Sequence, residues 1–239
     1  MARSTNDDLS GRIGNLIYYQ RDGKTYVRRR PTGKRSGGTE EERAQQDFAL
    51  ASKYGSALLN RLKAELYHKL KLTDHNRLRG WINKQLRARQ ADNEWKITSV
   101  STSCCSIHGA ENINNSMLVP VTFAQLPGGD VQVQVPAFVP AQQIIAPPNA
   151  ISITLKMMLV GSAFAGHSPT KGFDSKEWSF PWRYAEQPAQ EFTLSAGLQP
   201  GDIMLLVLAI HYTVVERMQE LPCQDRKYAL AAIVGMGRV

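Results

Sequence analysis

The alternation of apolar and polar positions is most distinctive between residues 9 and 38. Two β-rich runs, residues 15–20 and 25–30, flank the dipeptide Asp22-Gly23. Both residues of a two-residue Asp-Gly loop tolerate a positive φ, so this pattern predicts a β-hairpin. The pairs across the ribbon would then be Tyr19 with Tyr26, Tyr18 with Val27, Ile17 with Arg28, and Leu16 with Arg29. We therefore expect both faces to be apolar near the turn and cationic farther away.

The predicted ribbon carries apolar side chains on both of its faces. A two-stranded ribbon is marginal in water on its own, and a single flat docking surface can cover only one of its two apolar faces. We therefore expect one face to contact another subunit. The predicted assembly interface consists of Ile17, Tyr19 and Tyr26 on one face and Leu16, Tyr18 and Val27 on the other.

A helical period follows the ribbon. Thr39 and Glu42 have the spacing of a capping box, and apolar side chains then recur every three or four residues. This pattern predicts one amphipathic helix of about 30 residues over 39–70, with Phe48, Leu58, Leu62 and Leu66 facing protein. A second helix is expected over 73–91, with Leu78, Ile82 and Leu86 as its apolar positions. The first helix is too long for a compact DNA-binding helix-turn-helix.

From Trp95 onward the period changes to that of strands. The predicted strands are residues 117–125, 131–135, 151–164, 203–215 and 228–234, separated by segments rich in proline and glycine. Residues 131–135 alternate strictly, which is typical of a strand with one wet face, and the apolar run 204–210 is expected to be central. Several such strands favour an immunoglobulin-like antiparallel β-sandwich.

These elements define the expected fold class and domains. We predict an α+β protein with an N-terminal β-hairpin, a two-helix segment and the immunoglobulin-like antiparallel β-sandwich. The expected domains are a basic arm over residues 1–38, a helical segment over 39–94 and the sandwich over 95–239.

One stretch of sequence resembles a known pattern. Ser10-Gly11-Arg12-Ile13-Gly14-Asn15, then Tyr19, Gly23-Lys24, Tyr26-Val27-Arg28 and Pro31, precede the predicted long helix and sandwich. This order resembles bacterial families of unknown function that start with Ser-Gly-Lys-x-Gly-Asn-x-Val and a short hairpin ending in Arg-x-x-Pro. Here Arg12 replaces the usual lysine. The resemblance supports the architecture and implies no activity or partner.

Positive charge gathers in the first part of the chain. The formal net charge is +8, yet residues 1–96 hold 21 Lys/Arg against 11 Asp/Glu, and the remaining residues hold 8 against 10. Such asymmetry indicates that one region meets a polyanion or an acidic partner. The alternative is a solvated cationic surface that keeps the protein soluble. The predicted polyanion-binding residues are Arg28, Arg29, Arg30, Lys34 and Arg35.

The sequence contains none of the common catalytic or phosphate-binding motifs. Cys104, Cys105 and His108 do not have a usual zinc spacing, and buried thiols are the expected explanation. His211 lies in an apolar run, where we expect a core histidine. The aromatic run 178–182 fits a ligand platform, a lid over the core or an interface anchor. We therefore expect no cofactor, metal or small-molecule substrate.

The composition limits the cellular compartments in which we expect the protein. The chain has 239 residues and lacks an apolar run of roughly 18 residues, the length that a spanning helix needs. The first ten residues lack an apolar segment, so we expect neither a Sec signal peptide nor a membrane partner. Three cysteines, two of them adjacent, favour a reducing compartment. The expected location is the cytoplasm or a particle assembled there.

Two functional hypotheses follow. The first is a non-enzymatic structural protein that self-associates through its N-terminal hairpin arm into a homo-oligomer or polymer. The alternative is a nucleic-acid-binding protein that uses the basic arm, with arginines on phosphates and tyrosines stacked on bases. An enzyme on an unfamiliar scaffold is a third interpretation, for which the sequence offers no catalytic constellation.

Overall fold

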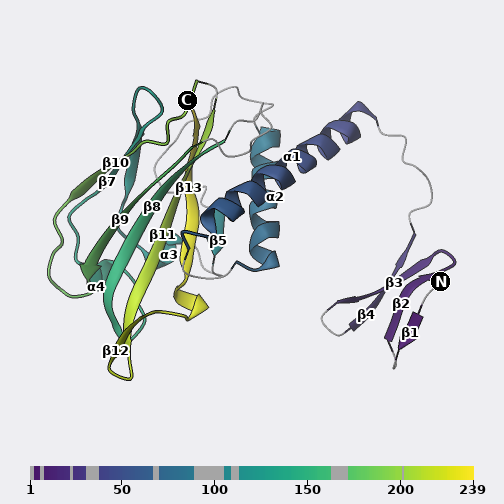
Figure 1. The fold of residues 1–239 in the computed structure, drawn as a ribbon, viewed down its shortest axis with the longest axis horizontal. Coiled ribbons are helices and arrows are strands. Elements are labelled where there is room, and N and C mark those ends of the chain that lie inside the picture. Colours follow the sequence, from purple (N-terminus) through teal and green to yellow (C-terminus); the bar gives the residue numbers. More distant parts are fainter. Residues whose placement is uncertain are drawn as a thin grey trace. The chain divides into compact units, whose positions relative to one another are not determined.

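The computed structural model describes residues 3–5, 8–21, 24–30, 38–66, 70–88, 105–108, 113–162, 172–200 and 202–239 (Figure 1). The fold is α+β, and its strand pairings are antiparallel. The chain divides into two compact units, Met1–Ala44 and Gln45–Val239. The three expected domains, 1–38, 39–94 and 95–239, remain a prediction.

The first unit contains a four-stranded sheet in the order β1-β2-β3-β4. Its strands are Arg3–Thr5, Asp8–Ile13, Leu16–Arg21 and Lys24–Arg29. The predicted register is confirmed, because Tyr19 pairs with Tyr26 and Ile17 with Arg28. The Asp22-Gly23 loop and Pro31 lie outside the described residues, but the pairing of Arg21 with Lys24 leaves two residues for that loop.

The N-terminal sheet has four strands and is larger than the predicted two-stranded hairpin. Strands β2 and β3 form a second hairpin, in which Ile13 pairs with Leu16 across Gly14-Asn15. Gly14 has a φ of 56°, a conformation that glycine adopts without steric cost, and Arg12 Nε donates to its carbonyl oxygen over 3.2 Å. Gly-Asn between apolar runs is itself a hairpin signal, so the short sequence motif has a structural role.

Helix α1 (Thr39–Leu62) begins where it was predicted and ends earlier than expected. The Gly38 carbonyl accepts from the Glu42 N–H over 3.2 Å, so Gly38 rather than Thr39 occupies the N-cap position. At the other end, the N–H groups of Glu65 and Leu66 both donate to the Leu62 carbonyl at 3.0 Å, which closes a turn. Helix α2 (Leu72–Ala88) matches the second prediction closely.

The rest of the chain forms two sheets. A six-stranded sheet has the order β5-β13-β11-β8-β9, with β12 also paired to β11, and a three-stranded sheet has the order β10-β7-β6. The strands are β5 Cys105–His108, β6 Thr122–Gln125, β7 Val131–Val135, β8 Ala150–Ser162, β9 Gly172–Pro181, β10 Gln190–Leu194, β11 Ile203–Glu216, β12 Gln219–Pro222 and β13 Leu230–Arg238. The short helices are α3 Ile113–Ser116, α4 Pro140–Gln143 and η1 Arg226–Tyr228.

Most of the predicted strands are present. Strand β7 coincides with the alternating run, and its three valines are buried. Residues 204–210 of β11 are buried at the centre of the larger sheet, as expected. The prediction for 117–125 was too long, because Met117 forms only an isolated bridge with Ile144 and β6 starts at Thr122. Strands β5, β9, β10 and β12 were not predicted.

The six-stranded sheet is covered on both faces (Figure 1). Met157 and Leu206 belong to a core cluster shared with Val133 of the three-stranded sheet. Met158 and Val207, on the opposite face, belong to a second cluster. That cluster includes Leu58, Leu59, Leu62 and Leu66 from α1 and the turn after it, and Leu78 and Ile82 from α2. The second unit, Gln45–Val239, is called the body below, and it has a helical layer, a large sheet and a small sheet.

Phe48 was expected to face protein, and this prediction was wrong. Its side chain is 51% exposed, whereas Ala51 is fully buried. The packed face of α1 therefore begins near Ala51, one turn after Phe48. The Leu86 side chain lies outside the described part of the chain.

We predict that Leu62→Ala lowers the free energy of unfolding by about 2–5 kcal/mol, because its side chain is fully buried between α1 and the sheet. Leu72→Ala removes the same atoms from a side chain that is 75% exposed, and it should change stability by at most about 0.5 kcal/mol. Urea unfolding followed by circular dichroism compares the two variants. Equal losses would contradict the layered packing.

Candidate functional site

One face of the N-terminal sheet combines aromatic rings with cations. The register puts Ile17, Tyr19, Tyr26 and Arg28 on this face. The rings of Tyr19 and Tyr26 stack with centroids 5.7 Å apart and planes inclined by 22°. The Arg28 guanidinium carbon lies 5.8 Å from the Tyr19 centroid, within the range of a cation–π contact. We call this surface the tyrosine face.

The opposite face is more aliphatic. Leu16, Tyr18 and Val27 share it with Ile13, which pairs with Leu16. Val27 is 52% exposed and Ile13 51%, against 42% for Tyr19 on the tyrosine face. None of the side chains that the structure describes from Gly11 to Arg30 is buried. Both faces of the sheet therefore keep apolar surface in contact with water.

The predicted polyanion-binding residues that the structure describes lie on both faces of the sheet. Arg28, Arg29 and Arg30 are exposed, whereas Lys34 and Arg35 lie outside the described residues. Successive strand residues point to opposite faces, so Arg29 shares a face with Val27, and Arg28 lies on the tyrosine face. The Arg30 N–H donates to the Asn15 carbonyl over 2.6 Å, which extends the β3–β4 ladder and places Arg30 on the tyrosine face.

Two further cations on the tyrosine face were missed by the sequence reasoning. Arg12 pairs with Ile17, and Lys24 pairs with Arg21 at the turn end of the hairpin, which puts both on the same face as Tyr19. Strand β2 had not been predicted, so only the Gly14-Asn15 turn signal could have assigned Arg12 to this face. The tyrosine face therefore carries Arg12, Lys24, Arg28 and Arg30 around two stacked rings.

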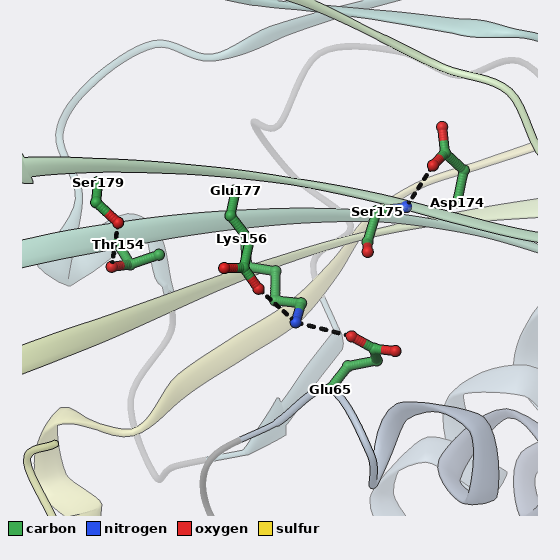
Figure 2. A network of polar contacts seen from close by, with 7 residues as sticks. All are labelled: Glu65, Thr154, Lys156, Asp174, Ser175, Glu177 and Ser179. Atoms are coloured by element: carbon green, nitrogen blue, oxygen red, sulfur yellow. Dashed lines mark hydrogen bonds and ion pairs between the residues drawn. The ribbon is translucent and has the colours of Figure 1, made fainter.

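A second polar cluster lies within the body, on the helix-covered face of the large sheet (Figure 2). Lys156 of β8 is only 6% exposed. Its ammonium nitrogen lies 2.7 Å from Glu65 Oε2, in the turn after α1, and 2.6 Å from Glu177 Oε1 on β9. On the same two strands the hydroxyls of Thr154 and Ser179 are 2.7 Å apart. Lys156 therefore ties the helical layer to the sheet.

The two carboxylates keep Lys156 charged. Burial alone would lower the pKa of the ammonium group, but the hydrogen bonds and charges of Glu177 and Glu65 raise it above 10.5. An amine with a raised pKa does not lose its proton near neutral pH, so it is a poor nucleophile. The arrangement is suited to a structural ion-pair network.

The other candidate residues lie in the core. Cys105 and Cys223 are buried, and burial raises the pKa of the Cys223 thiol. His211 is buried, at 5% exposure. Cys104 and the side chain of His108 are outside the described part of the structure. Within that part, no group of three or more His, Cys, Asp or Glu side chains is placed to hold a metal ion.

The aromatic run fits a core lid better than an open platform. Phe180 is buried and makes an edge contact with Phe138, with centroids 5.3 Å apart. Trp178 packs against both Phe180 and Phe192. Tyr184, just beyond this run, is 77% exposed.

The Lys156 network should make stability depend on pH. Because the folded-state pKa of Lys156 is raised, its ion pairs contribute fully below pH 10.5 and lose their contribution as pH rises through the folded value. We predict that Lys156→Ala costs about 1–3 kcal/mol at neutral pH, since it leaves the partly exposed carboxylates of Glu65 and Glu177 without their cation. Lys156→Met should cost less, and its unfolding free energy should fall less steeply above pH 10.5.

Urea unfolding across this pH range measures both effects. The exposed Lys53 on α1 provides a matched control, because Lys53→Met should keep the alkaline loss of the unmodified protein. An alkaline loss that is the same with and without Lys156 would contradict the assignment.

The candidate sites rest on the geometry of this chain. No helix in the described ranges is long and apolar enough to cross a membrane. The resemblance carried by residues 10–31 stays a prediction. The chain matches neither a protein-family model nor a curated protein sequence.

Proposed function

We propose that this protein is a non-enzymatic structural protein that self-associates through its N-terminal sheet. The observation that carries the proposal is apolar surface on both faces of a small sheet whose described side chains, from Gly11 to Arg30, are never buried. A sheet needs at least one covered hydrophobic face for independent stability. A second molecule supplies such a cover.

The free energies of apolar burial and of association indicate that both partners must contribute contacts to a stable assembly. Fully burying a large apolar side chain gives about 1.5–3 kcal/mol, so covering the exposed half of the three such side chains on one face gives roughly 2–5 kcal/mol. Association costs about 4–15 kcal/mol in lost freedom. One sheet alone therefore gives weak association at best, and stable assembly needs further contacts such as backbone hydrogen bonds.

The alternative function is nucleic-acid binding through the tyrosine face. Two stacked rings surrounded by Arg12, Lys24, Arg28 and Arg30 combine base-stacking surface with phosphate-binding charge. This alternative requires the tyrosine face to remain open. The self-association proposal requires only that one face be covered.

Two finer assignments accompany the proposal. The body is proposed to be an immunoglobulin-like sandwich, which is supported by two antiparallel sheets that share one core. A cytoplasmic location, or a particle assembled there, is supported by the buried free thiol of Cys223.

We predict that Tyr19→Ser combined with Tyr26→Ser weakens self-association at least tenfold and leaves the melting temperature of the body unchanged. The substitutions remove the stacked rings of the tyrosine face. Tyr184→Ser is the matched control, since it removes an equally large exposed ring from the body. Analytical ultracentrifugation measures the association, and deletion of residues 1–38 should abolish it. Unchanged assembly in the deletion variant would refute the proposal.

A separate prediction tests the alternative. If the tyrosine face binds nucleic acid, Arg28→Gln with Arg30→Gln should flatten the dependence of log affinity on log salt by about 1.4, at roughly 0.7 per phosphate contact on a single strand. Arg29→Gln, on the other face, should leave the slope nearly unchanged. Fluorescence anisotropy with a labelled single strand at several salt concentrations measures the slopes. Undetectable binding at low salt would exclude this function.

A further inference from the structure

Strand β4 has an open side. It is the last strand of its sheet, and the structure describes no partner beyond it. The hydrogen bond from Arg30 to Asn15 continues the β3–β4 register. Antiparallel ladders alternate between bonded and non-bonded pairs, so the backbones of Tyr26 and Arg28 also point towards β3. The N–H and C=O groups of Thr25, Val27 and Arg29 therefore point to the open side.

Strand β9 has a matching open side. It ends the path of the six-stranded sheet and, with ten residues, is the longest edge strand that the structure describes. The Trp182 N–H donates to the Ile151 carbonyl over 2.9 Å, continuing the β8–β9 register. The same alternation turns the backbone groups of Glu177 and Ser179 to the open side.

Among the described residues, only the second half of this edge has no hydrogen-bonded neighbour on its outer side. The Ser175 N–H is bonded to Asp174 Oδ1 over 2.8 Å (Figure 2). The Asp174 carboxylate also accepts from the Ser195 N–H, and the start of β9 lies close to the Ala196 backbone. The open stretch therefore runs from Glu177 to Pro181.

We propose that β4 of one copy adds to the open edge of β9 in a second copy, as an antiparallel strand with Val27 opposite Ser179 and Arg29 opposite Glu177. Each of these pairs exchanges two backbone hydrogen bonds, and the Thr25 N–H reaches the carbonyl of Pro181, which has no N–H of its own. The inference rests on the proposed function, since it names the surface on which the N-terminal sheet assembles.

Charge favours β9 over a second β4 as the partner. Residues 24–30 contain Lys24, Arg28, Arg29 and Arg30 and no acid, so pairing two β4 strands would bring cations together. In the proposed pairing Arg29 faces Glu177, whose side chain is 46% exposed. Arg28 lies opposite Trp178 on the other face, where a cation–π contact can form. The one like-charge contact is Arg30 opposite Lys176.

The pairing also sets the type of assembly. Each chain carries a donor strand and a different acceptor edge, so the contact is heterologous. Such contacts close into rings or continue as open filaments. The smallest such ring is a two-fold dimer in which two copies exchange their β4 strands.

Val27→Pro tests the pairing in the full chain. The Val27 N–H points away from β3, so proline removes the outward donor and leaves the internal ladder intact. We expect at least a tenfold loss of self-association by ultracentrifugation, with an unchanged far-ultraviolet circular dichroism spectrum. Val27→Ala, which keeps the N–H, should lose less. Assembly that survives Val27→Pro would overturn the pairing.

Cysteine trapping identifies the partner strand. Full-length chains with Val27→Cys and full-length chains with Ser179→Cys, mixed under mild oxidation, should give a covalent dimer that neither variant gives alone. A dimer from Val27→Cys alone would show β4–β4 pairing and overturn the inference. If the unmodified protein self-associates but the mixture gives no dimer, the pairing fails and the proposed function stands. If the unmodified protein is monomeric, the proposed function itself fails.

Discussion

The body depends on a sheet that must be covered on both of its faces. Successive apolar side chains of β8 and β11 point to opposite faces of the sheet. Met157 and Leu206 therefore need one covering layer, and Met158 and Val207 need another. The three-stranded sheet provides the first and the helices provide the second. The charge of Lys156 is buried in the helix-covered face of this sheet. Two carboxylates from separate elements compensate for that burial.

The N-terminal sheet has the opposite character. It has four strands, yet the side chains described from Gly11 to Arg30 include no buried residue. The stacking of Tyr19 on Tyr26 and the cation over Tyr19 are surface contacts worth little compared with a core. The body buries its apolar side chains in two core clusters, whereas the side chains described from Gly11 to Arg30 bury none. This difference is the physical basis for proposing assembly, since the N-terminal sheet gains most from a partner.

Local rules made parts of this structure predictable. The Asp-Gly loop fixed the β3–β4 register, and strict alternation identified β7, because both signals depend on neighbouring residues. The end of α1 was not predictable, since Leu66 continues the apolar spacing and is buried although the helix has already ended. Strand β9 was missed because Asp174, Lys176 and Glu177 conceal its pattern. The lone lysine in the apolar β8 was not singled out, and its pairing with Glu65 is a tertiary contact that no local pattern reveals.

The central claim is that apolar surface on the N-terminal sheet drives self-association. Sedimentation equilibrium of the unmodified protein, over a wide concentration range and at low and high salt, tests it most directly. The account predicts an average mass that rises above 26.6 kDa with concentration and persists at high salt, because burial of apolar surface is not screened by ions. A constant mass of 26.6 kDa up to high micromolar concentration would contradict it.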